Sequence, residues 1–182
     1  MGQNAAAERK PPFSRSIKVD EIPGGGMSDQ IEANAEERAA MANLLDLVSL
    51  ALLEYAFELK PTGVRGLLLN GRLRGRLTQH CVVSLEHIDI DIDTPLDVEF
   101  VSEKEFERRQ NAAEDELSDP DGPDVEPILG GEIDLGQLAY ESLATELEPY
   151  PRKKDADFRW EGAGTGDEDE GPFAALKELK EK

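Results

Sequence analysis

The stretch VRGLLLNGRLRGRLTQHCV, residues 64–82, alternates apolar and polar side chains over most of its length. One parity carries leucines and the other carries charged or polar side chains: Leu67, Leu69, Leu73 and Leu77 against Arg72, Arg74, Arg76, Thr78 and His80. Next, IDIDID at 88–93 repeats the two-residue period, and Leu96, Val98 and Phe100 continue it. A period of two is typical of a strand with one buried face. Both stretches are therefore predicted strands of an antiparallel sheet with one solvated face.

Further strands are predicted at 53–59, which ends at Pro61-Thr62-Gly63, and at 13–19, which ends before Pro23 and three glycines. A helix is predicted from N-caps at Ser28 or Asp29 through Asp46, because Asp29 and Glu32 approximate a capping box. Its apolar positions recur at helical spacing, and they are Ile31, Ala35, Ala39, Ala42 and Leu45. A second helix is predicted at 135–147, capped by Asp134 and ended by Pro149-Tyr150-Pro151.

These elements predict an α+β fold, a twisted antiparallel sheet packed with two helices. Residues 13–153 form the expected domain, after a disordered segment at 1–12. An acidic loop insertion at 102–127 holds ten acids and three bases, and it is expected to be mobile or partly helical at 103–109, with order resuming at Ile128. A flexible acidic linker at 154–171 and a short amphipathic helix at 172–182 complete the prediction.

The chain is strongly acidic, with 40 Asp and Glu against 20 Lys and Arg, a formal net charge of −20. Such a charge repels free DNA and anionic membranes at long range. Cys81 is the only cysteine, so an intramolecular disulfide is excluded. The most apolar stretch, 44–59, contains three acids and is too short to span a bilayer. The N-terminus has no apolar run typical of a signal peptide, so a cytoplasmic location is expected.

Catalytic and metal sites are not predicted, and no cofactor is expected. His80 and Cys81 are adjacent, so on a strand their side chains point to opposite faces and cannot form a nucleophile–base pair. A buried thiol and surface imidazoles at His80 and His87 are expected instead. Asp89, Asp91 and Asp93 imitate the start of a calcium loop, but Thr94 and Phe100 stand where that loop needs glycine and a closing acid.

The arginine stripe, Arg72, Arg74 and Arg76, is the one concentrated positive feature. Its spacing could follow a phosphate backbone, which makes RNA contact one interpretation. The favoured interpretation is a ladder of cross-strand ion pairs, 76–89, 74–91 and 72–93, which share one antiparallel register.

Four segments together resemble one family. They are QHCVVSLE at 79–86, IDLGQLAYE at 133–141, EPYPRK at 148–153 and GPFAAL at 171–176. In this order, around an acidic loop, they resemble the YceD family of bacterial and plastid large ribosomal RNA subunit accumulation proteins. The residues within the segments are similar to those of the alphaproteobacterial branch. The resemblance extends from about Phe13 to the C-terminus. Its motif positions here are Gln79, Cys81, Leu85, Glu86, Asp134, Glu141, Pro149 and Pro151.

The resemblance implies a non-enzymatic role in accumulation of large-subunit ribosomal RNA and in assembly of that subunit. Many members carry a C-x-x-C-L-E segment that suggests zinc, but Ser84 stands here in place of the second thiol. One thiolate cannot build a closed tetrahedral sulfur site, so no bound zinc is expected.

We expect a monomer that binds a ribosomal protein or a large-subunit ribosome precursor, since an acidic surface speeds the capture of basic proteins. The alternative is an acidic adaptor that docks its terminal segment, with Phe173 and Leu176, into a partner.

Overall fold

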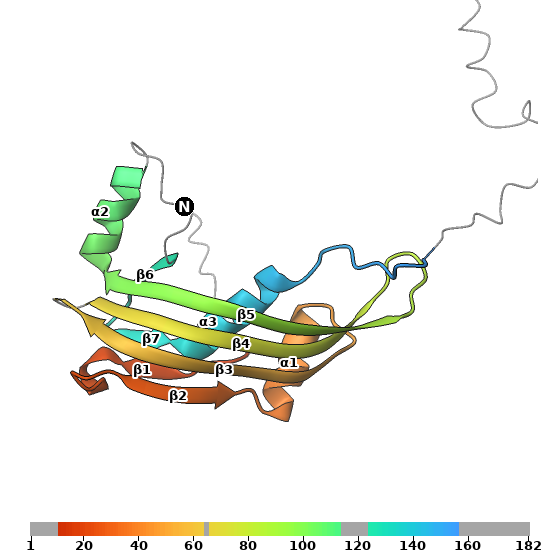
Figure 1. Cartoon of the computed structure of the whole chain (residues 1–182), viewed down its shortest axis with the longest axis horizontal. Helices are drawn as coiled ribbons and strands as arrows, with labels where there is room; N and C mark the ends of the chain where they lie inside the picture. The colour runs from red at the N-terminus through yellow and green to blue at the C-terminus, as the bar shows by residue number, and fades with distance from the viewer. Residues whose placement is uncertain (1–10, 64–65, 114–123, 157–182) are drawn as a thin grey trace, which may run out of the picture.

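The computed structural model describes residues 11–63, 66–113 and 124–156, and these form an α+β fold, as predicted. The main sheet has the order β2-β3-β4-β5-β6. Its strands are β2 (Met27–Glu32), β3 (Ser49–Thr62), β4 (Gly66–His80), β5 (His87–Ser102) and β6 (Asp124–Ile128). Strands β2 to β5 pair antiparallel, whereas β6 runs parallel to β5. The three long strands β3, β4 and β5 run side by side along the molecule (Figure 1).

A second, two-stranded sheet joins β1 (Ser16–Lys18) to β7 (Glu132–Asp134). The helices are α1 (Ala35–Leu44), α2 (Glu103–Ala113) and α3 (Leu135–Glu146), and a short 3-10 helix, η1 (Val19–Glu21), follows β1. Helices α1 and α3 and the small sheet contribute Met41, Leu143 and Ile133 to the same hydrophobic core as the leucines of the main sheet. They therefore pack on the apolar face of that sheet.

The alternation in β4 sorts its side chains as predicted. Leu67, Leu69, Leu73 and Leu77 are buried, while the arginines of the opposite parity are exposed. Gly71 fits between the strands because a Cβ there would lie 2.6 Å from the Tyr55 ring, closer than real Cβ contacts. Tyr55 is fully buried and its hydroxyl donates to the carbonyl of Leu96 at 3.3 Å. Burial raises the pKa of this hydroxyl, which keeps it neutral.

The predicted start of the first helix is wrong. Residues Met27–Glu32 form the edge strand β2, and α1 begins at Ala35. Asn34 caps the helix in a capping box with Glu37, and this cap lies five residues after Asp29. All six residues of β2 pair with β3. These backbone hydrogen bonds outweigh the weak helix propensity of the segment.

The helix expected at 103–109 within the acidic loop 102–127 is confirmed as α2, but the structure is regular over more of this segment than predicted. Helix α2 extends to Ala113, and order resumes at Asp124 in β6 rather than at Ile128. Pro127 is tolerated in β6 because this strand forms the edge of the sheet. The second predicted helix is confirmed as α3, which Asp134 caps. The segments expected at 1–12, 154–171 and 172–182 lie largely or wholly outside the described residues.

Candidate functional site

The arginine stripe lies on the solvated face of β4 and contacts aspartates of β5. Arg72 lies 3.1 Å from Asp93, and Arg76 lies 3.2 Å from Asp91. Arg74 lies 3.3 Å from Glu54 of β3 and 3.9 Å from Asp93. These arginines are 50–65% exposed, so each pair contributes little to stability, on the order of 0–1 kcal/mol.

The predicted register of this ladder is wrong by two residues. Arg76 is opposite Asp91 and Arg74 is opposite Asp93, while Asp89 is opposite Thr78. Thr78 donates a hydrogen bond to Asp89 at 2.8 Å. The register depends on the turn at 81–86, which places His80 opposite His87. Charge pattern alone allows either register, because aspartates stand at every second position.

Two of the family-like segments meet at one end of the sheet. This motif corner consists of residues 79–86, which include the turn between β4 and β5, and of the segment 148–153 after α3, and the two run side by side in Figure 1. The Val82 N–H donates to the Pro151 carbonyl at 2.9 Å, and Lys153 Nζ lies 3.1 Å from the Glu86 carboxylate. Lys153 lowers the pKa of Glu86, with help from the Ser84 hydroxyl.

Cys81 lies at the centre of the motif corner. Its thiol is fully buried and accepts the N–H groups of Ser84 at 3.4 Å and Lys153 at 3.5 Å. Hydrogen bonds from the side chain and backbone of Ser84, and from the backbone of Lys153, lower the pKa of Cys81 to about 6. The sulfur thus joins the two segments through hydrogen bonds. No group of three potential metal ligands occurs within the described part of the chain.

A groove of about 420 Å³ opens beside the motif corner. Gln79 lines it and is buried, and its Oε1 has no hydrogen-bond partner among the described residues. Leu85, also at the groove, is 72% exposed and has a φ of 59°, a conformation that is costly for leucine. Tyr150, between the lining residues Pro149 and Pro151, is 70% exposed. The exposed Leu85 and Tyr150 side chains therefore give the corner an apolar contact surface.

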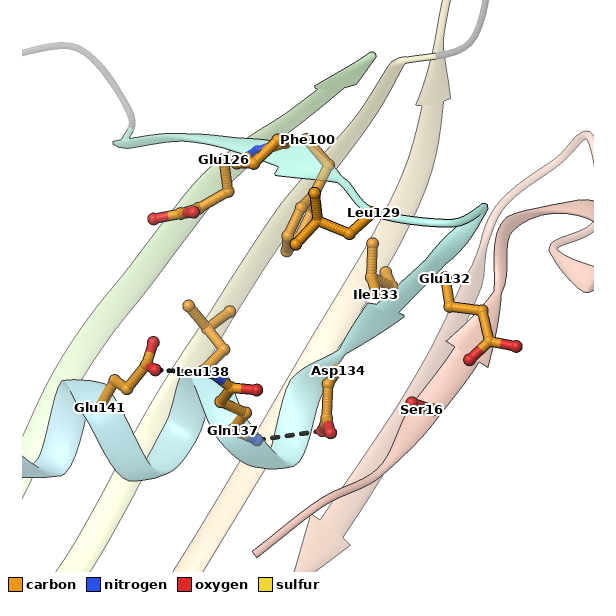
Figure 2. Close-up of a pocket in the computed structure, with 11 residues that line it drawn as sticks. Ser16, Phe100, Glu126, Leu129, Glu132, Ile133, Asp134, Gln137, Leu138 and Glu141 are labelled. Carbon is orange, nitrogen blue, oxygen red and sulfur yellow. Dashed lines mark hydrogen bonds between the residues drawn. The ribbon is translucent and has the colours of Figure 1, made fainter. Parts of the chain in front are cut away.

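A second cavity, of about 330 Å³, contains the other motif acids (Figure 2). We call it the acidic pocket, and its principal lining residues are Phe100, Glu126, Leu129, Ile133, Leu138 and Glu141. Asp134 also lines it, but this carboxylate is occupied as the cap of α3, accepting from Gly136 and Gln137 N–H at 3.0 Å. Glu141 accepts a hydrogen bond from the Gln137 side chain at 2.8 Å.

The charge of Glu141 acts on Glu126 in the acidic pocket. Burial raises the pKa of Glu126, and the negative charges of Glu141 and Asp124 raise it further. The pocket therefore concentrates negative charge over an apolar floor, an arrangement that attracts a cation with an apolar stem.

The site residues predicted from the sequence thus lie in separate parts of the structure. Gln79, Cys81, Leu85, Glu86, Pro149 and Pro151 meet at the motif corner and its groove, and Asp134 and Glu141 line the acidic pocket. The arginine stripe occupies the solvated face, and Phe173 and Leu176 lie outside the described residues.

Sequence reasoning missed Glu126 and Leu129 as site residues. They reach the pocket because β6 adds to β5 in parallel, and the surrounding acids and prolines gave no signal for that pairing.

Comparison with known proteins identifies the family. Residues 69–180 match the family model described as "Large ribosomal RNA subunit accumulation protein YceD". Searches of curated proteins and of solved structures returned no match. Across the described ranges, no helix has the length and apolar character needed to cross a membrane.

The match covers more than half of the chain and includes all four segments that carried the resemblance. The part of the resemblance between Phe13 and residue 68 lies outside it. The chain belongs to the YceD family of large ribosomal RNA subunit accumulation proteins.

Proposed function

We propose that this protein supports accumulation of large-subunit ribosomal RNA as a non-enzymatic factor that binds a basic ribosomal protein during subunit assembly. Family membership is the observation that carries the proposal. The cytoplasm, where bacterial ribosomes assemble, is the proposed location.

The surroundings of Cys81, the candidate nucleophile, support a function in binding rather than in catalysis. Cys81 is fully covered, and its sulfur accepts two backbone N–H groups. His80 points away into solvent, with Nδ1 3.1 Å from the carbonyl of Leu85. These groups hold the turn of the motif corner together, and a substrate would have to displace that packing to reach the thiol.

The charge distribution favours a basic protein over RNA as the direct partner. A net charge of −20 repels a polyanion, whereas it accelerates encounter with a basic protein. The arginine stripe is the obvious candidate for phosphate contact, but all three of its guanidinium groups face carboxylates within 3.3 Å. RNA would have to compete with those carboxylates.

A clean deletion of the gene tests the proposed function. We expect less large-subunit ribosomal RNA relative to small-subunit RNA, under normal growth and in the cold, with restoration by a plasmid copy of the wild-type gene. RNA quantified by gel or sequencing gives the ratio directly. An unchanged ratio under both growth conditions would contradict the proposal.

A further inference from the structure

We propose that the acidic pocket receives an arginine side chain from a basic segment of the ribosomal protein partner. The inference rests on the proposed function for the source of that arginine. It adds the site of contact and the chemistry that recognises the partner.

The walls of the acidic pocket suit a long side chain with an apolar stem. Phe100 and Ile133 are buried beneath it, and Leu138 of α3 is half-buried. Leu129 is 63% exposed, one of the most exposed large apolar side chains in the described part of the protein. A volume of about 330 Å³ is at the lower end of the range for ligand pockets and accommodates one such side chain.

The carboxylates are placed to receive a cation over that apolar floor. Glu126 comes from β6 and Glu141 from α3, and both line the pocket together with Leu138 (Figure 2). The described residues that line the pocket include no lysine or arginine. Among the ion pairs within 11–63, 66–113 and 124–156, none includes Glu126 or Glu141.

The two carboxylates also repel each other while no cation is present. Desolvation raises the pKa of Glu126, and the negative charges of Glu141 and Asp124 raise it further. A cation between the two groups removes the repulsion and gains two charge-assisted hydrogen bonds. The Gln137 side chain already orients Glu141 through its hydrogen bond of 2.8 Å, so little side-chain entropy is lost on binding.

Arginine fits this arrangement better than lysine. Its planar guanidinium carries several N–H donors and can bridge carboxylates that come from different elements. It is also more weakly hydrated than an ammonium group, so it can lie against Phe100, Leu129 and Leu138 at a lower desolvation cost. Phosphate, and hence an RNA backbone, is disfavoured by the same two carboxylates.

Fluorescence anisotropy with the full-length protein tests the pocket. The probe is a fluorescein-labelled peptide of alternating arginine and leucine residues, titrated at about 0.15 M salt, where long-range attraction is screened. We expect the double variant Glu126→Gln and Glu141→Gln to raise the Kd about tenfold, which corresponds to roughly 1.4 kcal/mol. We expect Leu129→Ser to raise it several-fold.

A matched control separates the pocket from the general negative field. Glu36→Gln with Asp155→Asn changes the net charge equally at exposed sites that do not line the pocket. This control should bind within about twofold of the wild type, because only long-range attraction changes. Circular dichroism melting checks that all the variants remain folded.

Three results would overturn the inference. Equal weakening by the control and the pocket variant would mean that net charge alone attracts the peptide. Unchanged binding by both pocket variants would exclude this surface. A dimer in light scattering that Leu129→Ser converts to a monomer would assign the pocket to a second copy of the chain. Each result leaves the deletion phenotype untouched, so the inference and the proposed function can fail separately.

Discussion

Asp134 connects three parts of the protein through a single carboxylate. Its Oδ1 accepts the N–H groups of Gly136 and Gln137 at the start of α3, and also the N–H of Arg15 at 2.7 Å. Its Oδ2 accepts the Ser14 hydroxyl at 2.5 Å. The cap could be predicted from the sequence, but the contacts with Ser14 and Arg15 could not, because residues 120 and 119 positions apart leave no local pattern.

We predict that Asp134→Ala lowers the free energy of unfolding by about 2–3 kcal/mol, since it removes a helix cap and two further hydrogen bonds. Asp134→Asn is the matched control. It keeps the Oδ1 acceptor and can donate to Ser14, so it should cost less than about 1 kcal/mol. Urea unfolding measures both values. Equal losses for the two variants would show that charge matters here rather than hydrogen bonding.

The motif corner allows a prediction about metal. We expect purified protein to contain no stoichiometric zinc, and chelation with EDTA to leave the melting temperature unchanged. Ser84 supplies no second thiolate, and the Cys81 sulfur is already engaged by two N–H groups. Elemental analysis checks the metal content. Zinc at one equivalent would require a site built from His80, Cys81, His87 and an acid, and the Cys81 sulfur would then bind the metal instead of accepting the two N–H groups.

Among the secondary-structure elements, the alternation of apolar and polar residues predicted β3, β4 and β5 and the buried face of each strand. This works because successive side chains of a strand point to opposite faces, so a two-residue period marks the buried face. Strands β2 and β6 were missed for a different reason. Each is short, lies at an edge of the sheet and is mostly polar, so pairing with a longer neighbour determines its structure. The register of β4 and β5 was missed because the turn between them decides it.

That register can be tested by exchanging charges. Arg76→Glu places a carboxylate opposite Asp91 and should lower the free energy of unfolding by about 1 kcal/mol. Adding Asp91→Arg should restore most of the loss, because the ion pair is rebuilt with reversed polarity. Adding Asp89→Arg instead should restore less, since residue 89 is opposite Thr78. Stronger rescue by Asp89→Arg would support the register first predicted from the sequence.

In the molecule as a whole, the residues that match the family model and the residues that form the fold are not the same. The match begins at residue 69, yet β2 and β3 and the core residues Phe13, Met41 and Tyr55 precede it. The motif segments could be recognised in the sequence. Only the fold shows that some of them form the motif corner and others line the acidic pocket. The pocket depends on β6, β7 and α3 converging, which no single segment predicts.

The net charge leads to a prediction about stability. Raising NaCl from about 0.1 M to about 1 M shortens the Debye length from roughly 10 Å to 3 Å. This screens the repulsion among the acids of a chain with a net charge of −20, and it also weakens exposed ion pairs such as those of the arginine stripe. Exposed pairs contribute little, so the loss of repulsion should dominate.

We therefore expect the free energy of unfolding to rise with NaCl, as measured by urea unfolding at each salt concentration. Sucrose is the control for general effects of co-solvents, because it stabilises by exclusion from the surface without screening charge. A variant with Arg72, Arg74 and Arg76 changed to Gln has a net charge more negative by three and lacks the ladder, so salt should stabilise it more than the wild type. Destabilisation of the wild type by NaCl would mean that the cross-strand pairs outweigh the repulsion, and the arginine stripe would then be a principal source of stability for the sheet.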